Sequence, residues 1–119
     1  MTEKIIKVGE TTRLFCKRGE IYWINFSHTI GTEIKKIRPA LVIFSSEKRV
    51  VSLPITSNIR KTPDWQLVIK GLIKGRDGKI LFDQIRSFDK QRLFRKIGEI
   101  NNEEMEQINQ MLKKMFLIK

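Results

Sequence analysis

The chain has 119 residues, 40% of them hydrophobic, with one cysteine, one histidine and a formal net charge of +11. One domain with its own core is expected at this length, while a single cysteine excludes an internal disulfide and, with a single histidine, leaves no ligand set for a zinc centre. No apolar run approaches bilayer-spanning length, and the polar start MTEKIIKVGETTRLF lacks the apolar centre of a signal peptide, so we expect a cytoplasmic protein without metal or cofactor.

An extension and a strand are the first segments along the chain. Residues 1–17 are mixed and weakly patterned, and we expect them to form an extension outside a single main domain at 18–119. RGEIYWINF (18–26) is rich in β-branched and aromatic residues and predicts a strand that starts after Gly19. The domain is therefore expected to begin with a strand.

Two further strands are predicted beyond a polar loop, SHTIGTEIKKI (27–37). RPALVIFSS (38–46) is almost wholly apolar and predicts a buried strand entered through Pro39, because proline at the first position of a strand costs no ladder hydrogen bond. KRVVSLPIT (48–56) predicts another strand, and Pro54 near its end indicates a sheet edge or a bulge.

A hairpin and a short turn are predicted next. The strands WQLVIKGLI and KILFDQIRSF (79–88) flank KGRDGK, and Asp77-Gly78 is a typical pair for the hairpin turn between them. DKQRL (89–93) predicts one helical turn, and RKIGEI (95–100) predicts a last short strand.

The last segment, residues 101–116, predicts a helix. Its apolar residues at positions 105, 108, 112 and 115 recur at helical spacing, and Asn101 followed by Glu104 is typical of a capping box. Short strands followed by one closing helix favour a β-rich α+β domain, built as a small curled antiparallel barrel.

The charge indicates a class of partner. Twenty-four Lys and Arg stand against 13 Asp and Glu, and such an excess destabilises a small domain by self-repulsion unless a polyanion offsets it. Nucleic acid is the natural partner, with an acidic protein second. A membrane surface is disfavoured because the predicted helix carries both charge signs on its polar face. The alternative, that the charge only keeps the protein soluble, stays open.

Three polar clusters interrupt the apolar strands: Arg38, then Thr56 with Ser57, then Asp83 with Gln84 and Arg86. Each lies at or near a predicted strand end, where a side chain can reach a shared surface from a rigid support. An arginine, a hydroxyl and a carboxylate without metal ligands suit phosphodiester chemistry on RNA, because RNA supplies its own nucleophile, the 2′-OH.

Each cluster has a chemical and a structural interpretation. Arg38 would stabilise charge on a phosphorane, and Thr56 would donate to a non-bridging oxygen. Asp83 would take the 2′ proton, which requires partial burial because an ordinary aspartate has a pKa of about 3.9. Alternatively, Arg38 forms an ion pair with Glu33, Thr56 and Ser57 bond to turn backbone, and the Asp83 carboxylate is structural.

In this order, the clusters resemble the MazF/PemK/Kid family of toxin endoribonucleases. The likeness runs from RGEIYWINF through GTEIKKIRPALVI and LPITS to FDQIRSFDKQRL and the last helix, roughly residues 18–116. It rests on G-x-E-x-x-x-x-R-P, then P-[IV]-T-S, then [DE]-Q-x-R-x-x-D, which are specific in combination.

The resemblance implies a fold, an activity and partners. The fold would be an SH3-like antiparallel barrel with a C-terminal helix, forming a homodimer. The activity would be that of the toxin of a type II toxin–antitoxin system, cleaving single-stranded mRNA at a short sequence. Neither a metal nor the ribosome would be needed, and the ends would be a 2′,3′-cyclic phosphate and a 5′-OH. An acidic, partly disordered antitoxin segment would block the RNA groove.

The resemblance also assigns residues. It places Arg38 on the family's catalytic arginine, Thr56 on its catalytic threonine and Asp83 on its acidic residue. The substrate-facing positions would be Gly31, Thr32, Glu33, Lys35, Lys36, Ser57, Gln84 and Arg86. The chain departs from the plasmid-borne branch at Leu81, where that branch has an arginine, and at Thr32, where it has a histidine. Arg38 is therefore expected to carry more of the catalytic charge stabilisation.

Two other functions stay open. The first is a gyrase-poisoning relative of the CcdB type, which would have no use for Arg38, Thr56 and Asp83. The second is a decayed toxin or an RNA-binding barrel that does not cleave, which would show salt-dependent RNA binding alone. The aromatic residues lie mostly in strands, as packing, rather than as an exposed stacking series.

Overall fold

The computed structural model describes residues 16–26 and 37–117. The elements in this part are β1 (Glu20–Asn25), β2 (Ile37–Ser45), β3 (Arg49–Thr56), β4 (Gln66–Ile73), β5 (Arg76–Leu81), the 3-10 turn η2 (Phe82–Gln84), β6 (Arg86–Asp89), the 3-10 turn η3 (Lys90–Arg92), β7 (Leu93–Glu99) and α1 (Asn102–Met115). The predictions for residues 1–15 and for the loop at 27–36 lie outside the described residues.

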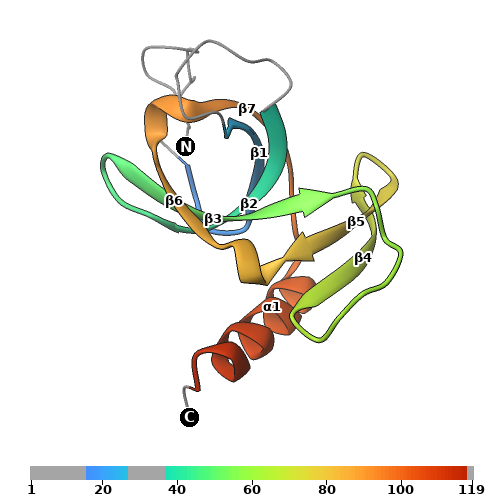
Figure 1. The fold of residues 1–119 in the computed structure, drawn as a ribbon. Coiled ribbons are helices and arrows are strands. Elements are labelled where there is room, and N and C mark those ends of the chain that lie inside the picture. The colour runs from blue at the N-terminus through green and yellow to red at the C-terminus, as the bar shows by residue number, and fades with distance from the viewer. Residues whose placement is uncertain (1–15, 27–36, 118–119) are drawn as a thin grey trace.

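The strands form one antiparallel sheet in the order β4-β5-β3-β2-β1-β7, with β6 also paired to β3. Only the short turn η3 separates β6 from β7, so the two act as one bent strand whose first half pairs with β3 and whose second half pairs with β1. This wraps β1, β2 and β3 into a curled, barrel-like unit, and the β4–β5 hairpin extends to one side (Figure 1). The predicted β-rich curled barrel with one C-terminal helix is confirmed.

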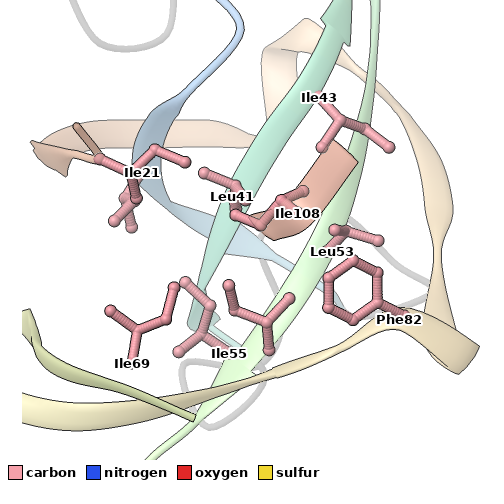
Figure 2. Packing of buried hydrophobic residues seen from close by; sticks show 10 residues of the cluster. Ile21, Leu41, Ile43, Leu53, Ile55, Ile69, Phe82 and Ile108 are labelled. Carbon is pink, nitrogen blue, oxygen red and sulfur yellow. The ribbon is translucent and has the colours of Figure 1, made fainter. Parts of the chain in front are cut away.

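Each face of the curled sheet buries its own apolar cluster, because successive strand residues point to opposite faces. One cluster includes Ile21, Leu41 and Leu53 and is completed by Ile108, the fully buried residue of α1 (Figure 2). The other includes Tyr22, Ala40, Val42, Val50, Phe88 and Leu93, together with Cys16. The helix therefore covers one face, while β6 and β7 close over the other.

The predicted capping box at the start of α1 is confirmed. Asn101 Oδ1 accepts from the Glu104 amide at 2.7 Å, and Glu104 Oε1 accepts from the Asn101 amide at 3.1 Å. Within the described ranges, no helix has the length and apolar character needed to cross a membrane.

Neither Pro39 nor Pro54 lies where the sequence predicts: Pro39 differs in its position along its strand, and Pro54 in the position of its strand within the sheet. Pro39 is the third residue of β2 rather than its entrance, because Ile37 and Arg38 already pair with β1. The pairing of β2 with β3 begins only at Ala40, so the strand is paired on one side at Pro39. Pro54 lies in a central strand, in the gap between the pairing of β3 with β6 and its pairing with β5. A missing N–H is tolerated at both places.

The hairpin turn between β4 and β5 is Lys74-Gly75, so the prediction of Asp77-Gly78 is wrong. Lys74 and Gly75 have φ of 49° and 87°, the left-handed conformation that a two-residue type I′ turn requires at both positions. Asp77 lies in β5 instead, where its Oδ1 accepts from the amide of Gly71 at 3.0 Å. Gly71 has a φ of 68° and lies within the register shift of β4, so the aspartate supports an irregular stretch of the strand.

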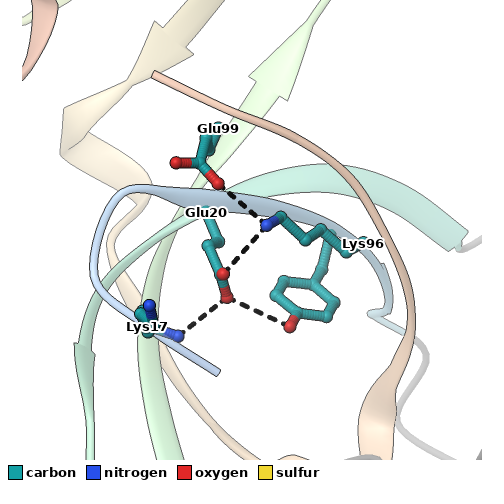
Figure 3. Close-up of polar contacts among 5 residues, drawn as sticks. Lys17, Glu20, Lys96 and Glu99 are labelled. Carbon is teal, nitrogen blue, oxygen red and sulfur yellow. Dashed lines mark hydrogen bonds and ion pairs between the residues drawn. The ribbon is translucent and has the colours of Figure 1, made fainter. Parts of the chain in front are cut away.

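A buried carboxylate ties β1 to β7 (Figure 3). Glu20 is 7% exposed and accepts from the Lys17 amide at 2.8 Å and from the Tyr22 hydroxyl at 3.1 Å. Its other oxygen lies 3.0 Å from Lys96 Nζ, which also bonds Glu99 at 2.8 Å. The bond to Glu99 raises the pKa of Lys96, and Lys96 in turn lowers the pKa of Glu99. This network stabilises the pairing of the first and last strands of the curled unit.

Candidate functional site

A pocket of about 360 Å³ lies beside the ends of β2 and β3, near the turn of the β4–β5 hairpin. Its polar and aromatic lining comprises Trp23, Arg38, Thr56, Ser57, Arg76 and Asp77. Two of the three clusters predicted from the sequence, Arg38 and Thr56-Ser57, therefore meet in one place. Arg38 and Thr56 come from different strands and are 18 positions apart in the chain.

Strand register explains why Arg38 and Thr56 meet. Ala40 of β2 pairs with Pro54 of β3 in an antiparallel ladder. Two residues further toward the same end of the sheet, β2 carries Arg38 and β3 carries Thr56, and a shift of two residues keeps a side chain on the same face. Arg38 is exposed and Thr56 half-buried, so both can reach a ligand while their backbone belongs to the sheet.

The Thr56 hydroxyl already bonds to backbone. Its Oγ1 accepts from the Asn58 amide at 3.2 Å, and the Asn58 side chain accepts from the Arg60 amide at 3.2 Å. This is the turn role that the structural interpretation of Thr56 predicts. A hydroxyl that accepts a bond still carries one proton to donate, so the turn role and a bond to a phosphate oxygen are compatible.

Sequence reasoning missed three residues of the pocket: Trp23, Arg76 and Asp77. The sequence pattern indicates strand packing for Trp23 and a hairpin turn for the other two. Once the turn moves to Lys74-Gly75, Arg76 becomes the first residue of β5 and lines the same pocket as Arg38. The pocket thus holds a second arginine, Arg76. Leu81, which stands where the plasmid-borne branch has its second arginine, is only 8% exposed and packs as an apolar residue.

The third predicted cluster lies elsewhere. KILFDQIRSF is not one strand but β5, η2 and β6, because the chain leaves its pairing with Ile55 and Thr56 and rejoins β3 at Ser52. In η2 the side chain of Phe82 takes the buried position. The prediction of partial burial for Asp83 is wrong, because Asp83 and Gln84 are exposed. Neither lines the pocket of Arg38, although the catalytic role given to Asp83 stays a prediction.

Arg86 belongs to a second pocket, of about 290 Å³, at the other end of β3. Arg49 and Arg92 line it too, and the Arg49 guanidinium donates to Ser87 Oγ at 3.1 Å. The Arg86 guanidinium lies 4.8 Å from the ring centroid of Phe88 and 5.8 Å from that of Phe26. Stacking on aromatic rings holds an arginine while leaving its N–H groups free to bind anions.

Cys16 is a core residue. Burial raises the pKa of Cys16 to about 11, so this thiol is neutral near pH 7 and packs as an apolar residue.

Among residues 16–26 and 37–117, no three His, Cys, Asp or Glu side chains gather as metal ligands would. The substrate-facing loop positions, Gly31, Thr32, Glu33, Lys35 and Lys36, lie outside the described residues.

The fold is that of known toxins. A solved endoribonuclease in complex with its cognate antitoxin from a Mycobacterial species superposes with a TM-score of 0.68 at 20% identity, covering 86% of this chain and 95% of that one. MazF (Form-I) from Deinococcus radiodurans gives a TM-score of 0.67 at 23% identity, with 87% and 97% covered. These likenesses establish a MazF-like fold.

The sequence establishes the family. Endoribonuclease MazF9 of Mycobacterium tuberculosis is 30% identical over 109 residues, covering 82% of this chain and 92% of the relative. Endoribonuclease EndoA of Bacillus subtilis is 33% identical over 107 residues, covering 83% and 92%. Residues 17–116 match the family described as the PemK-like, MazF-like toxin of type II toxin-antitoxin systems, and the chain belongs to that family.

Proposed function

We propose that the protein is the toxin of a toxin–antitoxin pair and that it cleaves single-stranded mRNA at a short sequence, in the cytoplasm and without metal or ribosome. The observation that carries the proposal is the meeting of Arg38 and Thr56 in one pocket. Both residues are predicted as catalytic from the sequence. The relatives MazF9 and EndoA are endoribonucleases, which supports the same activity for the domain at 18–119.

The chemistry proposed for the pocket follows from its side chains. The 2′-oxygen of RNA attacks the adjacent phosphorus, and the bond from phosphorus to the 5′-oxygen breaks. The 2′ proton passes to a base and the leaving 5′-oxygen takes up a proton, so a 2′,3′-cyclic phosphate and a 5′-OH result and the atoms balance without an added nucleophile. Arg38, with Arg76 beside it, stabilises the charge that develops on the phosphorane. Thr56 donates its free proton to a non-bridging oxygen.

Two carboxylates are candidates for the base that accepts the 2′ proton. Asp83 is the one that the family resemblance assigns, and it is exposed on η2. Asp77 is the carboxylate that lines the pocket with Arg38 and Thr56. One Asp77 oxygen accepts from the Gly71 amide, while a carboxylate has further lone pairs available to a proton. The pocket favours Asp77, and substitution of each aspartate separates the two assignments.

Substrate and partners are part of the same proposal. The second pocket, with Arg49 and Arg86, would bind backbone phosphates beyond the cleaved one. The predicted substrate-facing roles are kept for Ser57, Gln84, Arg86 and the loop residues Gly31, Thr32, Glu33, Lys35 and Lys36. An acidic antitoxin segment would occupy the same basic surface. A homodimer is supported by large apolar side chains that a single chain leaves exposed, such as Phe44 at 55% and Trp65 at 46%.

A barrel that binds RNA without cutting it is the second candidate, and the aromatic-backed Arg86 in the second pocket favours it. Such a barrel would retain salt-dependent binding and produce no new RNA ends. A gyrase-directed relative would neither bind nor cut RNA.

The deciding experiment is incubation of the purified protein with a long single-stranded RNA in excess EDTA, followed by mapping of the new 5′ ends. We expect cuts at one short motif with 5′-OH termini. Arg38→Ala should lower the rate by about 10²–10³, as loss of one transition-state donor does, with folding retained. Lys113→Ala is the control, because it removes an exposed cation of α1 that does not line this pocket. Full activity of folded Arg38→Ala would refute the role of Arg38.

A further inference from the structure

Lys79 is a buried lysine beside the proposed active site. It is 6% exposed and lies in β5, directly opposite Thr56 of β3 and Val68 of β4. Residues directly opposite each other in an antiparallel pair project to the same face, with Cβ atoms about 4.5–5.5 Å apart. Burial of an ammonium group is costly unless hydrogen bonds compensate it, so the partners of Lys79 indicate its role.

The partners are two backbone carbonyls of one loop. Lys79 Nζ donates to the carbonyl oxygen of Arg60 at 3.0 Å and to that of Lys61 at 3.3 Å. These carbonyls belong to the connection between β3 and β4, which begins directly after Thr56. Lys61 has a φ of 49°, a conformation that side-chain-bearing residues adopt rarely. The ammonium group therefore holds this loop where its backbone is least favourable.

Hydrogen bonds lead from this anchor to the proposed catalytic hydroxyl. Lys79 holds the carbonyl of Arg60, and the amide of Arg60 donates to the Asn58 side chain. The amide of Asn58 then donates to Thr56 Oγ1. The bonds made by Asn58 and Thr56 are exposed to solvent, and only the Lys79 end is buried. The order of the exposed part thus depends on the buried end.

We propose that Lys79 is a positioning residue for RNA cleavage. It fixes the loop after β3 so that Thr56 Oγ1 accepts from Asn58 and its own proton is directed at the scissile phosphate. This inference rests on the proposed function, but its structural half can be tested without RNA. Lys79 does not need to touch the substrate, because it acts through the loop.

The first test measures how well two backbone amides of the loop are protected from hydrogen exchange. Lys79→Met keeps an unbranched, buried side chain of similar length but cannot donate. Amide hydrogen exchange of Asn58 and Arg60, followed by NMR, should become at least about tenfold faster in this variant. Lys70→Met is the control, because it removes the same charge from an exposed position of the neighbouring β4. Lys79→Arg, which can still donate, should keep most of the protection. Unchanged exchange in Lys79→Met would overturn the proposal.

The second test measures chemistry apart from binding. We expect Lys79→Met to lower the single-turnover cleavage rate about 10- to 100-fold, since small misplacements of a catalytic group cost this much. The Kd for an RNA with a 2′-deoxy substitution at the cut should change less than twofold. In a Thr56→Val background, the same substitution should change the rate less than threefold, because coupled residues are not additive. Full additivity, or a wild-type rate in Lys79→Met, would refute the positioning role.

The outcomes separate the two proposals. A wild-type protein that cuts no RNA contradicts the proposed function and the catalytic half of the inference, while exchange at Asn58 and Arg60 still decides whether Lys79 orders the loop. Should Lys79→Met fail to fold, Lys79→Gln takes its place, because an amide keeps one donor group of shorter reach. Cleavage should then fall in the order wild type, Lys79→Arg, Lys79→Gln, and any other order contradicts the inference.

Discussion

Arg38 is held by its neighbours in the chain and across the sheet. The ring of Pro39 restricts the preceding residue to extended conformations, and Arg38 pairs with Ile24 of β1. The backbone that carries the guanidinium is therefore fixed twice, while the side chain itself stays exposed. A basic loop that leads into a buried strand through Arg-Pro is thus a way of presenting one cation at a defined position.

The two candidate bases can be distinguished by matched substitutions. Asp77→Asn keeps an oxygen that can accept from Gly71 and leaves the strand intact, but it removes the carboxylate from the pocket. We expect it to lower cleavage by roughly 10²–10⁴, the usual contribution of a general base, and Asp83→Asn to lower it much less. Single-turnover rates in EDTA measure both. The reverse order would assign the base to Asp83 and would mean that the pocket is completed by groups beyond one chain.

The sequence predicts some residues of this site and not others, for identifiable reasons. Arg38 and Thr56 could be found because each interrupts an apolar strand near its end. Asp77 could not, because Asp-Gly is typical of a turn, whereas the turn falls at Lys74-Gly75 and Gly78 pairs with Ile69 inside the β4–β5 ladder. Lys79 resembles any other lysine in the sequence, and its burial depends on contacts with the distant Arg60 and Lys61.

At the scale of elements, the β4–β5 hairpin depends on its two-residue turn. Gly75→Ala places a side chain at a φ of 87° and should lower the free energy of unfolding by about 1 kcal/mol. Gly98→Ala is the control, because a Cβ at Gly98 would meet no atom within 4 Å, and a change within about 0.5 kcal/mol is expected there. Denaturant midpoints with unchanged slopes measure both. Equal losses in the two variants would contradict this account of the turn.

The sequence predicts most of the elements, but it predicts less well where each one begins and ends. A run of β-branched and aromatic residues predicted β1, and an almost wholly apolar run predicted β2. Helical spacing and the capping residues predicted α1, because these signals are local. The split of residues 79–88 into β5, η2 and β6 was not predictable, since an apolar run does not show that a strand changes partners along β3. That one break moves Asp83 and Arg86 away from the pocket of Arg38.

At the scale of the whole molecule, the charge of +11 predicts how RNA binding responds to salt. For single strands, log K falls with log salt by roughly 0.7 per neutralised phosphate. The double variant Arg49→Gln and Arg86→Gln should lower this slope by about 1.4, with Lys113→Gln on α1 as a control that changes it little. Titrations at several salt concentrations, on an RNA with a 2′-deoxy cut site, give the slopes. An unchanged slope in the double variant would exclude the second pocket from the RNA path.

The measurement that tests the central claim most directly compares two RNAs that differ at one atom. Both carry the mapped cleavage motif, and one lacks the 2′-oxygen at the nucleotide before the cut. In EDTA, wild-type protein should cut the first into a 2′,3′-cyclic phosphate and a 5′-OH, and should bind the second without cutting it. Cleavage of the deoxy RNA at the same position would contradict the account, because a pocket built on Arg38 and Thr56 relies on the nucleophile that RNA itself supplies.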